Sequence, residues 1–209
     1  GGARIQEGVR SMGGYAEIFR RNAQYSGVVP QVSVMLGPCA GGAAYSPALT
    51  DMVIMVEKSS FMFLTGPDVI KAVTGEVIDA ESLGGANVHT SVSGVAHVSV
   101  QSEKAALEMA RHFLSYLPSN NVENPPYVQP ADSLSRMDEE LNHMIPLEAT
   151  EPYVMHQVIE KIIDTDSFLE IQPDWARNAI VGLARIGGHS VGIVGQEPAI
   201  MAGVIDIDA

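Results

Sequence analysis

Cysteine is almost missing from this 209-residue chain, which contains only Cys39. A single cysteine excludes an internal disulfide framework and fits a reducing compartment. With no activating partner in view, we expect Cys39 to be a small buried apolar residue rather than a nucleophile. Apolar runs stay below the roughly 18 residues of a membrane-spanning helix, and no signal peptide is visible. We therefore expect no direct membrane association.

Basic residues are also few: 12 Lys and Arg stand against 25 Asp and Glu, for a net charge of −13. Residues 1–100 carry six basic and eight acidic residues, whereas residues 101–209 carry six and seventeen. This distribution lacks the basic footprint of a nucleic-acid-binding protein. A polyanionic ligand would dock on the first half, although scattered basic residues are usually just solvated.

The common catalytic and metal-binding signatures are missing as well. No lysine follows Gly42 until Lys58, which excludes a phosphate-binding loop there, and a GxSxG nucleophile elbow is absent from the same stretch. Neither a Ser/His/Asp set nor an HExxH or paired-cysteine spacing is found, so we expect no metal in this chain. The six histidines are scattered and are interpreted as core or surface residues.

The most informative stretch is residues 31–51, QVSVMLGPCAGGAAYSPALTD. Alternating apolar residues predict a strand over residues 31–36, which Gly37-Pro38 should end. Gly41-Gly42 then open a run of small residues that predicts the start of a buried helix. A helix start leaves backbone N–H groups without partners and could hold an anion, or a carbonyl oxygen that becomes one. Tight packing of strand against helix would explain the glycines equally well.

Strands and helices alternate along the first half, which predicts an α/β layout. Helices are expected from Ile5 to about residue 23, from residue 66 and over residues 104–117, and strands over residues 52–56 and 61–64. Gly13-Gly14 would mark a break in the first helix, or close packing. Residues 81–85 and 88–94 are predicted to be irregular.

A composition break follows, because residues 119–130 are rich in proline and asparagine. They predict a linker, continued by an acidic stretch to about residue 150. Beyond it we expect a helix from Val154, a β-hairpin of residues 179–186 and 191–194 turning at Gly187-Gly188, and a final strand over residues 201–207.

Several motifs together resemble one known family. In chain order they are residues 1–8 (GGARIQEG), 18–22 (IFRRN), 37–43 (GPCAGGA), 46–51 (SPALTD), 65–69 (TGPDV), 83–86 (LGGA) and 93–97 (SGVAH). They are similar to the carboxyltransferase (beta) subunits of biotin-dependent acyl-CoA carboxylases, of the propionyl-CoA carboxylase type. The resemblance covers essentially the whole chain, and the full family chain is more than twice as long. His97 belongs to the last motif, with a role that the sequence does not specify.

The resemblance implies a crotonase-like (ClpP/crotonase) α/β superhelix of ββα units. Residues 1–118 would be the C-terminal part of the N-terminal, acyl-CoA-binding half. Residues 119–150 would be a linker, and residues 151–209 the truncated start of the C-terminal, biotin-side half, whose own glycine corner would lie beyond Ala209.

The resemblance also implies an active site made by backbone groups. Ala3 and Gly42 would donate their N–H groups to the thioester oxygen as an oxyanion hole, next to Gly2 and Gly41. Substrate-binding positions would be Arg4, Ala43, Tyr45 and Ser46. Arg4 would contact a CoA phosphate or hold its corner by hydrogen bonds, and small-residue packing would explain Tyr45 and Ser46 almost as well.

The implied reaction moves a carboxyl group from carboxybiotin to the α-carbon of a short acyl-CoA, most plainly propionyl-CoA. Biotin would be carried by a partner, the biotin carboxylase/biotin carboxyl carrier (alpha) subunit, and its ureido nitrogen would accept the α-proton. The full-length chain would form a hexamer, in a bacterial cytoplasm or a mitochondrial matrix, and this fragment alone would be inactive.

Three alternatives stay open. The first is a biotin-dependent acyl-CoA decarboxylase or transcarboxylase subunit, which would use the same oxyanion hole. The second is a non-catalytic CoA-binding or assembly module. A crotonase-type hydratase is less favoured, because residues 37–48 contain no glutamate.

Overall fold

Strand β3 (Met52–Val56) is buried along its whole length. It is the middle strand of a three-stranded parallel sheet in the order β1-β3-β5, with β1 (Val32–Met35) and β5 (Val98–Val100) as its neighbours. Helix α6 (Glu103–Leu114) packs against all three strands. A parallel strand covered on both faces needs a continuous apolar run, which MVIMV supplies.

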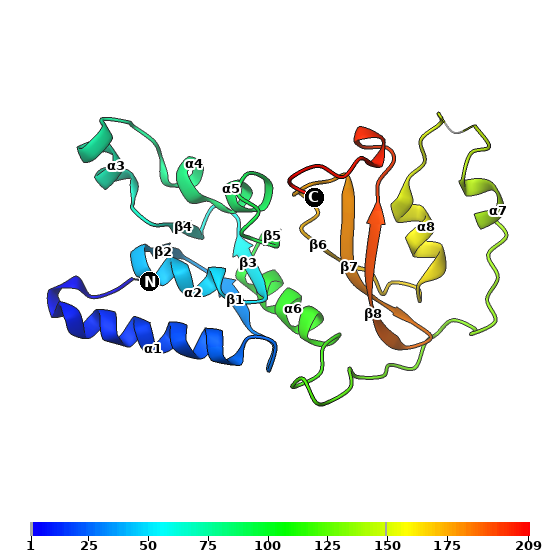
Figure 1. Ribbon diagram of the computed structural model, residues 1–209, viewed down its shortest axis with the longest axis horizontal. Coiled ribbons are helices and arrows are strands. Elements are labelled where there is room, and N and C mark those ends of the chain that lie inside the picture. The colour runs from blue at the N-terminus through cyan, green and yellow to red at the C-terminus, as the bar shows by residue number, and fades with distance from the viewer. Residues whose placement is uncertain (1, 149) are drawn as a thin grey trace. The chain divides into compact units, whose positions relative to one another are not determined.

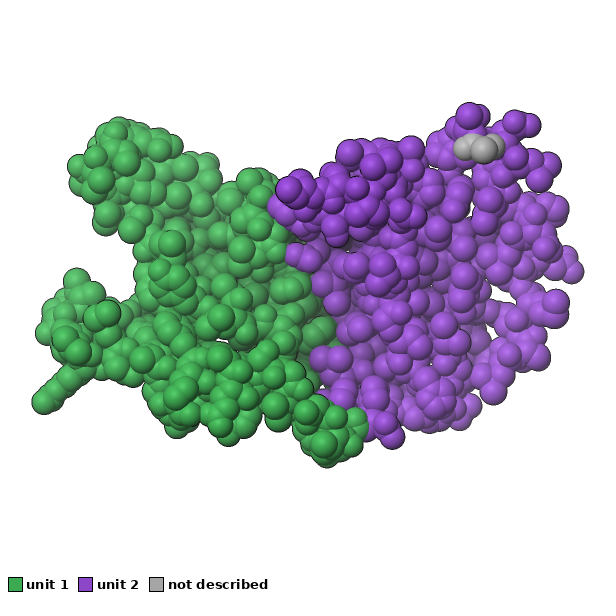
Figure 2. All heavy atoms as spheres, viewed as in Figure 1, with its two compact units in different colours: residues 1–114, 119–123 green, residues 115–118, 124–209 purple. Residues whose placement is uncertain are grey.

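The computed structural model describes residues 2–148 and 150–209, so Gly1 and Ala149 lie outside the description. The chain divides into two units (Figure 2). The first comprises the residues up to Leu114 together with Ser119–Glu123. The second comprises Ser115–Pro118 together with Asn124–Ala209.

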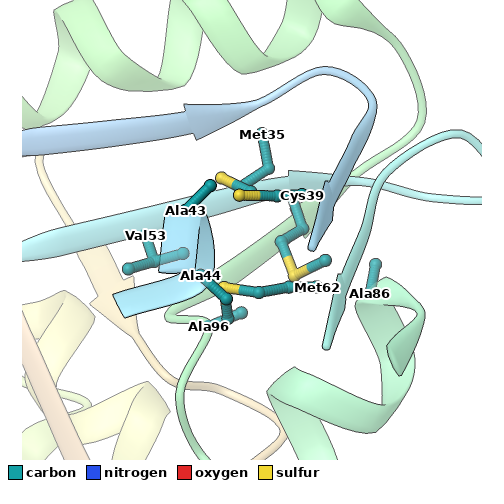
Figure 3. Close-up of a cluster of buried hydrophobic side chains, with 9 residues drawn as sticks. Met35, Cys39, Ala43, Ala44, Val53, Met62, Ala86 and Ala96 are labelled. Atoms are coloured by element: carbon teal, nitrogen blue, oxygen red, sulfur yellow. The ribbon is translucent and has the colours of Figure 1, made fainter. Parts of the chain in front are cut away.

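A second parallel pair in the first unit was not expected. The chain was predicted to leave its strand at Gly37-Pro38, but it forms strand β2 (Pro38–Ala40) there, beside β4 (Phe61–Phe63). Buried side chains from β1, β2, β3 and β4 pack together in a core cluster of mostly small and sulfur-containing residues (Figure 3). Cys39 lies in this cluster, and burial raises the pKa of its thiol, as expected for an apolar role.

The helices of the first unit differ from the sequence prediction at two places (Figure 1). After the 3-10 turn η1 (Ile5–Glu7), helix α1 (Val9–Tyr25) continues through Gly13-Gly14 without a break, because two helical glycines cost propensity but keep their hydrogen bonds. Helix α3 (Pro67–Thr74) begins as predicted.

The segments predicted to be irregular are two short helices. They are α4 (Ala80–Gly84) and α5 (Ala86–Ser91). The Asp79 side chain accepts a hydrogen bond from the Ser82 N–H and so caps α4, a signal that the surrounding glycines obscured.

The second unit contains an antiparallel sheet in the order β6-β7-β8. Its strands are β6 (Leu169–Ile171), β7 (Ala179–Ile186) and β8 (His189–Gln196), and β7 and β8 form the predicted hairpin. Both turn glycines, Gly187 and Gly188, have positive φ, as a tight two-residue hairpin turn requires. Helix α8 (Met155–Ile162) packs on this sheet through Ile159, and a one-turn helix, α7 (Leu141–Met144), precedes it.

The final strand predicted over residues 201–207 is wrong. The chain forms a 3-10 turn there, η3 (Met201–Gly203), and then runs on without a sheet partner. Side chains hold it instead, because Asn178 Nδ2 donates to the Val204 carbonyl at 2.6 Å and Trp175 Nε1 donates to the Asp208 carbonyl at 3.0 Å.

Two side chains within these units have structural roles that can be tested. Arg185 is buried on β7, where its guanidinium donates to the carbonyls of Ser115 and Pro126 and to the Ser190 hydroxyl. The guanidinium carbon also lies 4.5 Å from the centre of the Tyr116 ring. Arg185 therefore fastens the backbone at Ser115 and at Pro126 to the hairpin, all within the second unit.

His97 is the second such side chain. The imidazole Nδ1 of His97 accepts a hydrogen bond from the Val53 N–H at 3.0 Å, and the backbone N–H of His97 donates to the Val53 carbonyl at 2.9 Å. Burial lowers the pKa of its imidazole, although Asp51 opposes this shift. The imidazole thus holds the entry of β3 in its neutral form, which accounts for His97 without any catalytic role.

We expect Arg185→Met to lower the free energy of unfolding by about 2–4 kcal/mol, because it removes three hydrogen bonds made by a buried guanidinium. Urea denaturation measures the change. Arg177→Met is the matched control, since Arg177 is exposed just before the same strand and should change stability by less than about 0.5 kcal/mol. Equal effects of the two substitutions would contradict the role given to Arg185.

We expect the contribution of His97 to stability to depend on pH. Its folded pKa lies below the unfolded value of about 6.5, so the contribution is complete above that pH and is lost as pH falls below it. His97→Asn keeps an acceptor but cannot take up this proton, and it should flatten the fall in unfolding free energy as pH drops below about 6.5. The exposed His143→Asn is the control, and an unchanged slope in His97→Asn would refute the assignment.

Candidate functional site

The glycine-containing segments around Gly2, just before the first helix, and around Gly41-Gly42, just after β2, are the two glycine corners of this chain, and they lie beside each other in the first unit. A methyl carbon built on Gly2 would lie 3.5 Å from the carbonyl oxygen of Ala40, the residue just before Gly41. Residues 2–4 lead into η1 and then α1, whereas residues 40–42 leave β2. The fold therefore brings the Ala3 segment next to the Gly41-Gly42 turn, as the resemblance implies.

At the second corner, Gly41 turns the backbone and Gly42 has open space beside it. Gly41 has a φ of +64°, a conformation that side chains rarely adopt, and so fixes the turn. Gly42 does not have a positive φ, and a methyl carbon built on it would meet no atom within 4 Å. Free space therefore lies in front of Gly42, while its backbone tolerates a side chain.

The backbone amides of both corners are available. Within the described part of the chain, neither the Ala3 nor the Gly42 N–H donates a hydrogen bond outside the helices and strands. Gly42 is the second residue of a 3-10 turn, where an N–H has no partner within the turn. Two amide donors in one neighbourhood suit a carbonyl oxygen that gains negative charge.

The buried helix expected after Gly42 is shorter than predicted. The chain forms the 3-10 turn η2 (Gly41–Ala44) and one turn of helix, α2 (Tyr45–Ala48). Ala43 and Ala44 are buried in the core cluster, as Figure 3 shows, so small side chains here serve packing. Such short elements contribute little helix dipole, which leaves the N–H groups themselves as the electrostatic feature.

The predicted substrate-binding side chains do not converge on this corner. Arg4 is highly exposed, with 78% of its side-chain surface accessible, and makes only a weak 3.5 Å contact with Glu7. Tyr45 is half exposed and meets the Phe19 ring edge-on at 6.0 Å. The Ser46 hydroxyl donates to Asn22 Oδ1 at 3.0 Å, and so is engaged with α1.

Two polar residues near this corner were not singled out from the sequence. Asn22 on α1 and Gln31 at the entry of β1 bond to each other twice and connect to Ser46. Both residues are half-buried. The only sequence signal is that Asn22 closes the IFRRN motif, which does not distinguish a buried amide from a solvated one.

The second unit contains a cluster of titratable groups that sequence reasoning also missed. His156 Nδ1 lies 3.1 Å from Glu197, and its Nε2 lies 3.0 Å from Glu170. Burial opposes the charged form, but the two carboxylates outweigh it and raise the pKa of His156. The cluster lines a cavity of about 450 Å³ together with Arg177. The three residues come from separate elements, so no local motif announces them.

In the described ranges 2–148 and 150–209, no group of three His, Cys, Asp or Glu side chains could hold a metal ion. Over the same ranges, every helix is too short or too polar to cross a membrane.

Comparisons with known proteins match this chain over its whole length. Residues 1–209 match the family model described as the carboxyl transferase domain. The chain is 56% identical over 208 residues to the propionyl-CoA carboxylase carboxyltransferase subunit of Haloferax mediterranei, covering 100% of this chain and 40% of that relative. It is 51% identical over 209 residues to the methylmalonyl-CoA decarboxylase subunit alpha of Veillonella parvula, covering 100% and 41%.

A mitochondrial relative and a solved structure also match this chain over its whole length. The propionyl-CoA carboxylase beta chain of Sus scrofa is 50% identical over 209 residues, covering 100% of this chain and 39% of the relative. The transcarboxylase 12S hexamer, solved with hydrolysed methylmalonyl-CoA bound, superposes with a TM-score of 0.95 at 46% identity, covering 100% and 41%.

The likeness to transcarboxylase 12S confirms the crotonase-like α/β fold that the motifs implied. The chain spans about 40% of the length of the curated relatives that it matches. Since the family model covers every residue from 1 to 209, the chain belongs to the carboxyl transferase domain family.

Proposed function

We propose that this chain is part of a carboxyltransferase that moves a carboxyl group from carboxybiotin to the α-carbon of propionyl-CoA, giving methylmalonyl-CoA. The observation that carries the proposal is the open face of Gly42, whose free N–H lies at a corner in close approach to the Ala3 segment. Identities of 50–56% to propionyl-CoA carboxylase subunits support the choice of substrate.

Removing the α-proton of a thioester moves negative charge onto the thioester oxygen. The Ala3 and Gly42 N–H groups would donate to that oxygen and stabilise the enolate more than the ground-state carbonyl. Gly41 fixes the second turn through its positive φ, Gly2 lies against the Ala40 carbonyl, and the absence of a side chain at Gly42 would leave room for the thioester. Carboxybiotin would supply the carboxyl group as CO2 released from its ureido nitrogen: the enolate carbon would form a bond to that CO2, and the freed nitrogen would take up the α-proton.

The more distant expectations rest on the relatives. Residues 1–118 would belong to the acyl-CoA half and residues 151–209 to the biotin-side half, joined by residues 119–150. The full-length chain would assemble as a hexamer, like the transcarboxylase 12S structure, with biotin carried by an alpha subunit. Both bacterial and mitochondrial relatives exist, so a bacterial cytoplasm or a mitochondrial matrix would house it.

The same site would also serve the reverse reaction. The 51% identity to a methylmalonyl-CoA decarboxylase subunit favours this second candidate specifically. An oxyanion hole stabilises the same enolate whether the carboxyl group arrives or leaves, so these residues do not separate the two directions.

We expect Gly42→Val in the full-length chain, assembled with its biotinylated partner, to lower carboxylation of propionyl-CoA by about 100- to 1,000-fold. The added side chain would fill the space in front of the N–H without straining the backbone. Turnover on acetyl-, propionyl- and butyryl-CoA measures the loss and defines the acyl chain.

Gly14→Val is the matched control, because it adds the same side chain in open space on α1 and should leave turnover unchanged. Full activity of a folded Gly42→Val enzyme would contradict the oxyanion-hole assignment. Decarboxylation of methylmalonyl-CoA without carboxylation would select the second candidate, and silence in both directions would leave a CoA-binding or assembly module.

A further inference from the structure

The helical turns that contain and follow Gly42 are too short to be stable on their own. Elements η2 and α2 have four residues each, and neither has a side-chain cap. Helical segments this short are unstable on their own in water. The position of the Gly42 N–H therefore depends on what anchors these two turns to the rest of the unit.

One anchor is apolar and one is polar. Ala43, Ala44 and Pro47 are buried and hold one side of the turns. On the other side, Ser46 lies one helical turn after Gly42, and its hydroxyl donates to Asn22 Oδ1 at 3.0 Å.

Asn22 is itself fixed from three directions. Besides accepting from Ser46, its Nδ2 donates to Gln31 Oε1 at 2.7 Å, and its carbonyl accepts from Gln31 Nε2 at 2.9 Å. Reversing either side-chain amide would set donor against donor or acceptor against acceptor, so both orientations are determined.

Gln31 connects this hydrogen-bond network to the three-stranded parallel sheet. Its N–H donates to Asp51 Oδ2 at 2.8 Å, and its carbonyl accepts from the Asp51 N–H at 2.9 Å. These contacts lie at the entries of β1 and β3. The network thus links the C-terminal part of α1, two strand entries and α2, the helical turn next to the open corner.

Helix α1 needs such a link, because none of its residues is fully buried. Apart from the network, α1 also meets α2 through the aromatic rings of Phe19 and Tyr45. Ring pairs tolerate sliding, whereas a network of oriented hydrogen bonds fixes a register.

We propose that Asn22 is a positioning residue, which sets the place of the Gly42 N–H by holding Ser46. This inference rests on the proposed function, since it concerns the same oxyanion hole. Asn22 acts through Ser46 and the backbone, and no contact with the substrate is required of it. A displacement of about 1 Å in a catalytic group can lower a rate by about 100-fold, so a single lost bond at this anchor would be visible in turnover.

The test uses the full-length holoenzyme with propionyl-CoA. Asn22→Ala and Ser46→Ala should each lower kcat by about 10- to 100-fold, while the Kd of propionyl-CoA, measured by calorimetry, stays unchanged. Ser46→Thr keeps the hydroxyl and should retain activity. Because both residues act through one bond, the double variant Asn22→Ala/Ser46→Ala should be no slower than the slower single variant.

Gln24→Ala is the control, since Gln24 lies exposed on the same helix and its side-chain oxygen accepts from Arg20, outside the network. It should leave kcat unchanged. Normal kcat in folded Asn22→Ala, multiplicative losses in the double variant, or a loss that appears in Kd rather than kcat would each overturn the inference.

The same assay separates this inference from the proposed function. If Gly42→Val abolishes turnover but Asn22→Ala does not lower it, the oxyanion hole stands and the positioning role fails. If Gly42→Val has normal turnover, or the wild-type holoenzyme has none, both fail together.

Discussion

The close approach of Gly2 to the Ala40 carbonyl is the constraint on which the proposed site depends. It brings the segment before α1 against the turn after β2, so close that a methyl carbon built on Gly2 would be in van der Waals contact with that carbonyl oxygen at 3.5 Å. Parallel strands hold this contact in place. Strand β2, which pairs with β4, leads directly into the turn, and the buried strand β3 pairs with β1, the strand that precedes β2. The reactive centre that we propose consists of backbone N–H groups and would require no titratable side chain of this chain.

Polar side chains do much of the holding in both units. In the first unit, Asn22, Gln31 and Ser46 join two helices to the sheet, and the neutral imidazole of His97 accepts a backbone N–H at β3. In the second unit, Asp164 accepts the N–H groups of both turn glycines, and Arg185 collects carbonyls from a distant segment. Oriented hydrogen bonds of this kind define one arrangement where small apolar side chains alone would permit several.

Much of the fold was predictable from local pattern. The residues of β3, the start of α3 and the glycine turn between β7 and β8 each have an unambiguous signal: a continuous apolar run, a proline in the first turn, and paired glycines between alternating residues. The errors have physical causes. Short helices such as α4 were hidden by glycines, and the strand expected at residues 201–207 lacks any sheet partner, which no local pattern reports.

The candidate site was predictable only through motifs. Neighbouring glycines alone fit close packing as well as an oxyanion hole, and the roles of Ala3 and Gly42 remain predictions carried by the family resemblance. Asn22 and Gln31 were missed because their significance lies in bonds to each other and to Ser46, which come from three different segments. A hydrogen-bond network between segments leaves no periodicity in the sequence.

The most direct test of the central claim is the carbonyl stretching frequency of propionyl-CoA bound to the full-length enzyme. Infrared difference spectroscopy with a ¹³C-labelled thioester carbonyl isolates that one bond. If two backbone N–H groups polarise the oxygen, the band of the bound thioester lies at lower wavenumber than in water. A band at or above its position in water would show that no oxyanion hole acts on the thioester.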